Sequence, residues 1–188
     1  MTVAGEHLDK TDLRRSAQAV RAQFAAAHPQ AAEAVATWAP RLSARCVAAY
    51  RPIRSEIDPF PLARKFAADR WALPVLNGKE MSFRSWAEGE PLVQGPFGIE
   101  EPLGDTVEPD FLIVPLLAFT REGGRLGYGA GHYDRYMAAH PGIRTVGIAY
   151  SAQELQTLPL EKHDQTLTAI ATEREWITIG EDLCVSSF

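Results

Sequence analysis

A glycine-rich stretch between an apolar run and a helical pattern is the feature that most constrains how this chain can fold. Glycines occupy positions 124, 127, 129 and 131, shortly after the apolar run 111–119. Beyond them, apolar and aromatic residues recur from Tyr133 to Met137 at the spacing of a helix face, and Pro141 ends that pattern. The sequence therefore predicts a strand, a glycine loop and a helix in succession.

A loop of this kind can bind an anion. Glycine has no Cβ atom, so backbone N–H groups can approach the anion closely, and the start of the helix adds unpaired N–H groups and partial positive charge. Arg125 supplies a fork of donors that suits phosphate oxygens. Asp134 is a hard oxygen ligand for magnesium. These residues indicate a site for a nucleotide polyphosphate with its metal, and a plain turn followed by a helix-stabilising Asp is the alternative.

Composition narrows the class of protein. The 188 residues are 46% hydrophobic, which suits one folded domain over 1–188 with a sizeable core. A net charge of -5 argues against bulk affinity for nucleic acid or anionic membranes, and no segment is apolar for the ~20 residues of a membrane helix. Cys46 and Cys184 show no metal spacing, and the polar start lacks the apolar core of a signal peptide. A cytoplasmic protein with reduced thiols is expected.

The first segment predicts an amphipathic helix with a basic stripe. Apolar residues recur every three or four positions over residues 9–27. Lys10, Arg14 and Arg21 lie along a neighbouring face of the same helix. A solvated charged face is the ordinary interpretation of such a stripe.

Further elements follow from the hydrophobic pattern and from turn residues. We expect helices at 31–38 and 62–69, a short helix at 151–156, and strands at 44–50, 111–114, 143–150, 167–171 and 176–179. Two more strands, 71–76 and 79–86, are joined by Asn77-Gly78, which is a strong hairpin signal. Asp58 is expected to cap the helix that begins near Pro59.

The stretch from Arg125 to Arg135, Arg-Leu-Gly-Tyr-Gly-Ala-Gly-His-Tyr-Asp-Arg, resembles the signature of the 5-formyltetrahydrofolate cyclo-ligase family, the methenyltetrahydrofolate synthetases. The resemblance covers nearly the whole chain. Four further motifs fall in the family's order: Lys10-Thr-Asp-Leu-Arg14, Tyr50-Arg-Pro-Ile-Arg-Ser-Glu-Ile-Asp58, Phe97-Gly-Ile-Glu-Glu-Pro102 and His163-Asp164.

The resemblance implies a fold and an activity. The fold is α/β, a single three-layer α/β/α domain with a mostly parallel sheet, NagB/RpiA/CoA transferase-like and so related to sugar-phosphate isomerases and CoA transferases. The activity is ATP- and Mg²⁺-dependent cyclisation of 5-formyltetrahydrofolate to 5,10-methenyltetrahydrofolate, with release of ADP and phosphate. The two small molecules are the expected partners of a monomer that binds neither nucleic acid nor membrane.

The resemblance also implies roles for particular residues, although it assigns no catalytic acid or base. ATP would contact Lys10, Arg14, Arg125, Leu126, Gly127, Tyr128, Gly129, Ala130, Gly131, His132 and Tyr133. Folate would contact Arg14, Arg51, Glu56, Phe97, Tyr128, Gly129, Ala130, Gly131, His132 and Tyr150. Magnesium would be held by Asp134 and Asp164.

The residues themselves leave three of these folate-side roles open. Glu56 follows a predicted strand at the sheet edge where ligands bind, and its carboxylate suits the N–H edge of a pterin, but a surface acid is the alternative. Phe97 stacks on the pterin or anchors its loop on the core. Tyr150 lines the pocket or packs in the core.

Some positions depart from the family pattern. Ala130 stands where relatives often carry Gly or Lys, and His132 replaces a more usual aromatic residue. Thr168 stands where many members have a second Asp, which weakens the expectation of a metal site.

Two other functions are open at this stage. One is a non-catalytic domain of the same fold that binds RNA or protein. The other is an isomerase-like enzyme of the same fold that acts on a sugar phosphate without ATP. The acidic net charge and the retained Lys10, Arg14 and Glu56 argue against the first, and the Glu56 segment argues against the second.

Overall fold

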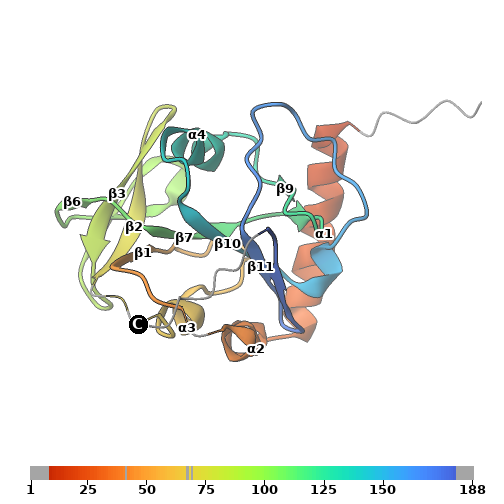
Figure 1. The fold of residues 1–188 in the computed structure, drawn as a ribbon, viewed down its shortest axis with the longest axis horizontal. Helices are drawn as coiled ribbons and strands as arrows, with labels where there is room; N and C mark the ends of the chain where they lie inside the picture. Colours follow the sequence, from red (N-terminus) through yellow and green to blue (C-terminus); the bar gives the residue numbers. More distant parts are fainter. Residues whose placement is uncertain (1–8, 41, 67, 69, 181–188) are drawn as a thin grey trace, which may run out of the picture.

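A mostly parallel sheet of eight strands forms the centre of the molecule (Figure 1). The computed structural model describes residues 9–40, 42–66, 68 and 70–180. In spatial order the strands are β12 (Trp176–Thr178), β11 (Ala169–Ala171), β10 (Arg144–Ile148), β7 (Phe111–Pro115), β1 (Cys46–Ala48), β2 (Arg70–Asn77), β3 (Glu80–Trp86) and β6 (Thr106–Val107). Strands β11 to β2 run parallel, and the outer strands pair antiparallel.

Helices cover both faces of this sheet. They are α1 (Lys10–Ala27), α2 (Ala31–Trp38), α3 (Phe60–Ala63) and α4 (His132–Ala139), with the 3₁₀ turns η1 (Pro96–Gly98) and η2 (Ser151–Gln153). In Figure 1, α4 lies above the sheet, α2 and α3 lie below it, and α1 stands at one side. This arrangement confirms the predicted α/β class with helices on both faces of a mostly parallel sheet.

The central strand β7 shows why the sequence forms three layers. All residues from Phe111 to Val114 are buried, and successive side chains point to opposite faces. Phe111 and Ile113 pack into the core between the sheet and the helices α2 and α3. Leu112 and Val114 pack into the core between the sheet and α4. A strand that is apolar at every position therefore needs a helix layer on each side.

Two small hairpins lie outside the main sheet, and the sequence pattern did not indicate them. One pairs β4 (Leu92–Gln94) with β5 (Glu100–Pro102), and the other pairs β8 (Ala118–Phe119) with β9 (Arg125–Leu126). The second hairpin turns at Gly123, whose φ of +88° favours glycine. The start of the glycine stretch is thus a short buried strand, and the loop proper begins at Gly127.

Most predicted elements are confirmed, with boundaries shifted by a few residues. The first two helices occur as expected, and the Asn77-Gly78 hairpin joins β2 to β3. The carboxylate of Asp58 accepts a hydrogen bond from the Phe60 N–H at 2.9 Å, although Pro59 is the residue at the N-cap position of α3. The short helix expected at 151–156 is the single 3₁₀ turn η2.

The helix predicted at 62–69 is wrong. The helical segment is the single turn α3, which ends at Ala63. Phe66 then turns into the core, where its ring lies 4.5 Å from that of Phe111, so the chain leaves the helical path to reach the sheet. Residues 67 and 69 lie outside the described part of the chain.

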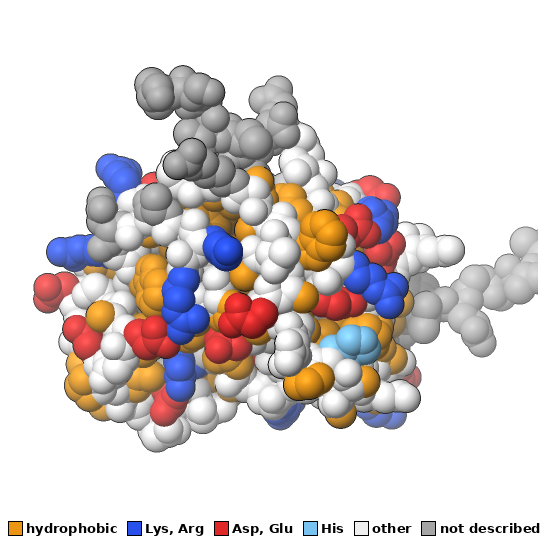
Figure 2. Space-filling view, turned by 90° about the horizontal axis from the view of Figure 1, so that it is seen from below, with side chains coloured by type: hydrophobic (Ala, Val, Ile, Leu, Met, Phe, Trp, Pro, Cys, Tyr) orange, Lys and Arg blue, Asp and Glu red, His pale blue; other side chains and the backbone are white. Residues whose placement is uncertain are grey.

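The outer face of the α2 and α3 layer is mixed in charge. Figure 2 shows this side of the molecule, where Lys and Arg side chains lie interspersed with Asp and Glu. None of the helices in the described ranges has the length and apolar character that a bilayer crossing requires.

We predict that Leu112→Ala will lower the free energy of unfolding by about 2–5 kcal/mol, because it opens a cavity in a fully buried site of β7. Leu103→Ala is the matched control. Its side chain is 57% exposed, so the same truncation should change stability by less than about 0.5 kcal/mol. Urea unfolding of the two variants measures both values, and equal losses would contradict the assigned core.

Candidate active site

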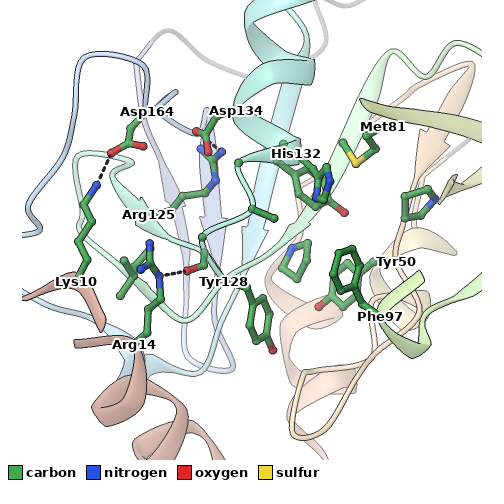
Figure 3. Close-up of a pocket in the computed structure, with 18 of the residues that line it drawn as sticks. Lys10, Arg14, Tyr50, Met81, Phe97, Arg125, Tyr128, His132, Asp134 and Asp164 are labelled. Atoms are coloured by element: carbon green, nitrogen blue, oxygen red, sulfur yellow. Dashed lines mark hydrogen bonds and ion pairs between the residues drawn. The ribbon is translucent and has the colours of Figure 1, made fainter. Parts of the chain in front are cut away.

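A cavity of about 640 Å³ opens beyond the carboxyl ends of the central strands. Leu76 near the end of β2, Pro115 at the end of β7 and Tyr50 after β1 form its floor. The first turns of α1, the glycine loop, the segment 50–56, the turn around Phe97 and the segment 158–164 surround it (Figure 3). Five segments that are distant in sequence therefore meet at the edge of the sheet where α/β proteins bind ligands.

The start of α1 brings two cations to this cavity. Asp9 caps the helix by accepting a hydrogen bond from the Thr11 N–H at 3.1 Å. Lys10 and Arg14, one turn apart, then lie on the same face and line the cavity. The Arg14 Nε donates a hydrogen bond to the carbonyl of Gly127 at 3.0 Å, which ties α1 to the glycine loop.

The glycine loop has the backbone geometry that only glycine adopts readily. Gly129 and Gly131 have φ of +100° and +68°, and Gly131 is the residue that precedes α4. An added Cβ on Gly129 would lie 3.1 Å from the Arg14 guanidinium carbon. The loop can therefore pass close to α1, and its backbone from Gly127 to His132 lines the cavity.

Arg125 and Asp134 form a buried ion pair beneath this loop. The Arg125 Nη2 lies 2.6 Å from Asp134 Oδ1, and its Nη1 donates to the carbonyl of Gln165. Asp134 Oδ1 also accepts a hydrogen bond from the Gln165 N–H at 2.9 Å. Burial lowers the pKa of the Arg125 guanidinium, and the charge of Asp134 partly offsets that effect. The pair fastens the segment after Asp164 to the start of α4.

Lys10 meets two carboxylates of the segment 158–164. Its Nζ lies 2.6 Å from Glu161 Oε1 and 3.4 Å from Asp164 Oδ2, and Figure 3 shows the contact with Asp164. Partial burial lowers the pKa of Lys10, but the hydrogen bond to Glu161 and the charge of Asp164 outweigh it and raise that pKa above its ordinary value. Asp164, which was predicted to hold the metal, and Lys10, which was predicted to contact the phosphates, are thus in direct contact.

Glu56, on the segment 50–56, is a buried acid that lines the cavity. Its Oε1 accepts a hydrogen bond from the Tyr128 hydroxyl at 2.9 Å, and its Oε2 accepts one from the Ile53 N–H at 2.9 Å. Arg21 lies beside it, with Nη1 at 3.5 Å from Oε1. Burial raises the pKa of Glu56, whereas the Ile53 N–H, Arg21 and Tyr128 oppose that rise.

The rim beside Glu56 is flat and apolar. Phe97 is 78% exposed with φ of +60°, lines the cavity and stands across from Tyr50 and Met81 (Figure 3). Arg51 also lines it and is held by Glu100, with its Nη2 at 3.0 Å from Oε2. His132 reaches the carbonyl of Gly78 in the hairpin, at 3.0 Å from Nε2. This half of the cavity suits a flat ring.

The structure brings nearly all the predicted site residues together. Every one of them lines the cavity except Tyr150, whose ring packs in the core 5.6 Å from that of Phe24. The geometry thus favours the core-packing alternative for Tyr150. Thr168 does not line the cavity either. It lies just before β11 and exchanges hydrogen bonds with Thr145 of β10.

Sequence reasoning missed two residues that act in this arrangement. Glu161 engages Lys10, yet its pairing across 151 positions left no local pattern in the sequence. Arg21 was placed on the basic stripe but given no role; its position seven residues after Arg14 was the available signal. Tyr50, named before only as the start of a motif, and Met81, which no pattern indicated, also line the cavity.

The fold and the cavity define the class of α/β proteins in which a small-molecule site lies beyond the carboxyl ends of a parallel sheet. Within that class, residues 6–173 match the sequence model of the 5-formyltetrahydrofolate cyclo-ligase family, and the chain belongs to this family.

Named relatives agree with this assignment. The chain is 35% identical over 156 residues to a 5-formyltetrahydrofolate cyclo-ligase of Escherichia coli (strain K12), which covers 76% of this chain and 86% of that protein. It is 32% identical over 162 residues to the protein of the same name from Mycolicibacterium smegmatis, covering 78% and 84%.

Solved structures resemble the whole fold. The 5,10-methenyltetrahydrofolate synthetase of Aquifex aeolicus aligns with a TM-score of 0.76 and 30% identity, covering 95% of this chain and 96% of that one. The synthetase of Mycoplasma pneumoniae aligns with a TM-score of 0.67, covering 88% and 99%, and at 23% identity this likeness concerns the fold alone.

We predict that Gly129→Ala will destabilise the protein by about 1–3 kcal/mol, because φ is +100° and the new methyl group would press on the Arg14 guanidinium. Gly127→Ala is the control, since nothing lies within 4 Å of its added Cβ and its φ is not positive. Its stability should stay within about 1 kcal/mol of the parent chain. Denaturant unfolding distinguishes the two, and an unchanged Gly129→Ala would contradict the close approach.

Proposed function

We propose that this chain catalyses the ATP-dependent cyclisation of 5-formyltetrahydrofolate to 5,10-methenyltetrahydrofolate, with release of ADP and phosphate. The observation that supports it most is the meeting of the α1 cations with the glycine loop at one end of the cavity, while Glu56 stands at the other. One end suits a triphosphate and the other suits a pterin, so both substrates have a place in the same cavity.

In the proposal, the triphosphate lies between α1 and the glycine loop. Lys10 contributes a point charge and Arg14 a planar fork, and both face the loop backbone from Gly127 to His132. The start of α4 adds N–H groups without helical partners. Arg125 supports this subsite from below while it remains paired with Asp134.

The pterin ring of the folate is proposed to lie between Glu56 and the apolar rim. The buried carboxylate accepts hydrogen bonds from the N–H edge of the ring, and Phe97 covers one of its faces. Tyr50 and Met81 complete an apolar surface that excludes water. Arg51 at the same rim would then meet the negative tail of the folate.

The reaction then needs position more than protein covalent chemistry. The formyl oxygen attacks the γ-phosphorus, the bond to ADP breaks, and an imidate phosphate forms. The neighbouring secondary amine attacks the formyl carbon, phosphate leaves with the oxygen, and loss of the amine proton completes the methenyl bridge. Lys10 and Arg14 stabilise the charge that moves onto the phosphate oxygens, and the cavity holds the reacting atoms in line. No general base is assigned.

Magnesium would be held by Asp134 and Asp164 together with phosphate oxygens. Within the described ranges, no group of three or more His, Cys, Asp and Glu side chains is arranged to hold a metal by itself. Magnesium bound to a nucleotide takes only one or two carboxylates, plus phosphates and water, so the two acids fit it. When bound, such an ion would neutralise part of the charge on the phosphates. Asp134 and Asp164 both line the cavity, so carboxylate oxygens are available there to hold the ion.

The competing functions have less support. A sugar phosphate is polar and has no flat ring, so a sugar-phosphate isomerase would not need the apolar rim of Phe97, Tyr50 and Met81. A domain that only binds RNA would not need a cavity of this size with converging cations, and the charges on the face of α2 and α3 are mixed (Figure 2). The proposal includes a monomer that works in the cytoplasm without a nucleic-acid partner.

The direct test is to mix the purified protein with 5-formyltetrahydrofolate and Mg-ATP and to follow the near-ultraviolet absorbance of the methenyl product. We expect product to form only when ATP is present, with one ADP released per methenyl group. Absence of ATP-dependent product would reject the proposed reaction.

We predict that Lys10→Ala will reduce kcat/KM for ATP by about 10- to 150-fold. A hydrogen bond to a charged group is worth about 1.5–3 kcal/mol, and each 1.4 kcal/mol is about tenfold. Arg15→Ala is the matched control, because Arg15 is a 77% exposed cation on the same helix, pairs with Asp12 and does not line the cavity. Its kinetics should remain within about twofold. A Lys10→Ala enzyme with unchanged ATP kinetics would remove Lys10 from the phosphate subsite.

A further inference from the structure

Arg21 is a buried charge behind the cavity lining that the proposed reaction does not use. Its side chain is 2% exposed and does not line the cavity. Its Nη2 donates to the Tyr128 hydroxyl at 2.7 Å, and its Nε donates to Ser55 Oγ at 3.1 Å. Its Nη1, at 3.5 Å from Glu56 Oε1, makes no hydrogen bond. Burying a guanidinium costs desolvation free energy, so the groups that Arg21 contacts indicate what it does here.

Arg21 and its partners belong to three separate segments. Arg21 is on α1, Glu56 follows β1, and Tyr128 is part of the glycine loop. The Tyr128 hydroxyl accepts from Arg21 and donates its single proton to Glu56. The guanidinium also lies over the Tyr128 ring, with its central carbon 5.7 Å from the ring centroid. One side chain thus connects the proposed folate acid to the proposed phosphate loop.

The hydrogen bonds on Glu56 leave room for a ligand with two donors. A carboxylate has about four acceptor positions, two on each oxygen. The Tyr128 hydroxyl takes one on Oε1, and the Ile53 N–H takes one on Oε2. One position therefore remains on each oxygen, which matches two parallel N–H donors on the edge of a ring. Tyr128 and Ile53 hold the carboxylate plane, while the Ile53 N–H and the positive charge of Arg21 oppose the rise in the pKa of Glu56 that burial causes.

We propose that Arg21 is a positioning residue that couples the two halves of the cavity through Glu56 and Tyr128. This inference rests on the proposed function. A triphosphate that orders the glycine loop also fixes Tyr128, and Tyr128 fixes Glu56 for the pterin edge. Each ligand then finds the network already ordered by the other, so the two bind with positive cooperativity.

The test is a binding cycle on the full chain. The affinity for 5-formyltetrahydrofolate is measured by calorimetry with and without the magnesium complex of a non-hydrolysable ATP analogue. In the parent chain we expect the analogue to tighten folate binding by about fivefold or more, within the usual range of coupling between sites. A ratio near one in the parent chain would overturn the inference.

Tyr128→Phe is the decisive variant, because it keeps the ring and the loop but removes the shared hydroxyl. In this variant we expect the analogue to tighten folate binding by only about twofold or less, even where the affinity for either ligand alone changes little. A purely structural role for the hydroxyl would alter stability or both affinities while leaving the ratio unchanged, and that result would contradict the coupling.

Arg21→Lys provides a second variant, which keeps the charge but loses the planar fork. The ratio of its folate affinities with and without the analogue should fall as in Tyr128→Phe. A ratio equal to that of the parent chain would exclude Arg21 from the coupling. Tyr136→Phe is the matched control: this buried Tyr on α4 packs against Phe83 outside the cavity, and its ratio should match the parent chain. Turnover of the parent chain is measured in parallel. Its absence would reject the proposed function, whereas turnover with an unchanged ratio in Tyr128→Phe would reject only the coupling.

Discussion

The docking of α1 onto the glycine loop is the contact on which the rest of the site depends. Arg14 and Gly127 are separated by 113 positions in sequence, yet a hydrogen bond of 3.0 Å joins them. The glycine at 129 permits that approach, since a side chain there would meet the guanidinium. With α1 in this place, Lys10 reaches the acids of the segment 158–164 and Arg21 reaches Glu56. The helix therefore organises both ends of one cavity.

Buried charge pairs give the site its rigidity. Arg125 with Asp134 and Arg21 with Glu56 are both largely withdrawn from water, where the desolvation of each ion is expensive. Such pairs contribute little net stability compared with apolar side chains of similar size, but they hold polar groups in one arrangement. A phosphoryl transfer benefits from that arrangement, because fixed charges need no reorganisation as the transition state forms. The electrostatic design thus serves position rather than stability.

Local sequence patterns were sufficient for some parts of the fold and insufficient for others. The helix α1, the hairpin between β2 and β3 and the buried strand β7 follow from periodicity and turn residues, which act over a few positions. The helix expected at 62–69 fails because Phe66 is drawn to Phe111, a partner that local propensity cannot reveal. Tertiary packing overrides the helical preference there.

The candidate site shows the same division. The glycine loop was found from its own residues, whereas the two cations of α1 and Glu56 were assigned through motifs that resemble those of the cyclo-ligase family. Glu161 and the role of Arg21 were not found, because each depends on a partner from a distant segment. Tyr150 illustrates the reverse case. A position at the end of a buried strand suits a cavity or a core equally, and only the packing of Phe24 on its ring decides between them.

The central claim is that the start of α1 and the glycine loop bind one triphosphate between them. A crystal structure of the protein with magnesium and a non-hydrolysable ATP analogue tests it most directly. We expect phosphate oxygens within hydrogen-bond distance of both Lys10 and the backbone of residues 127–131. Phosphates bound elsewhere, or touching the loop while α1 stays out of reach, would contradict it.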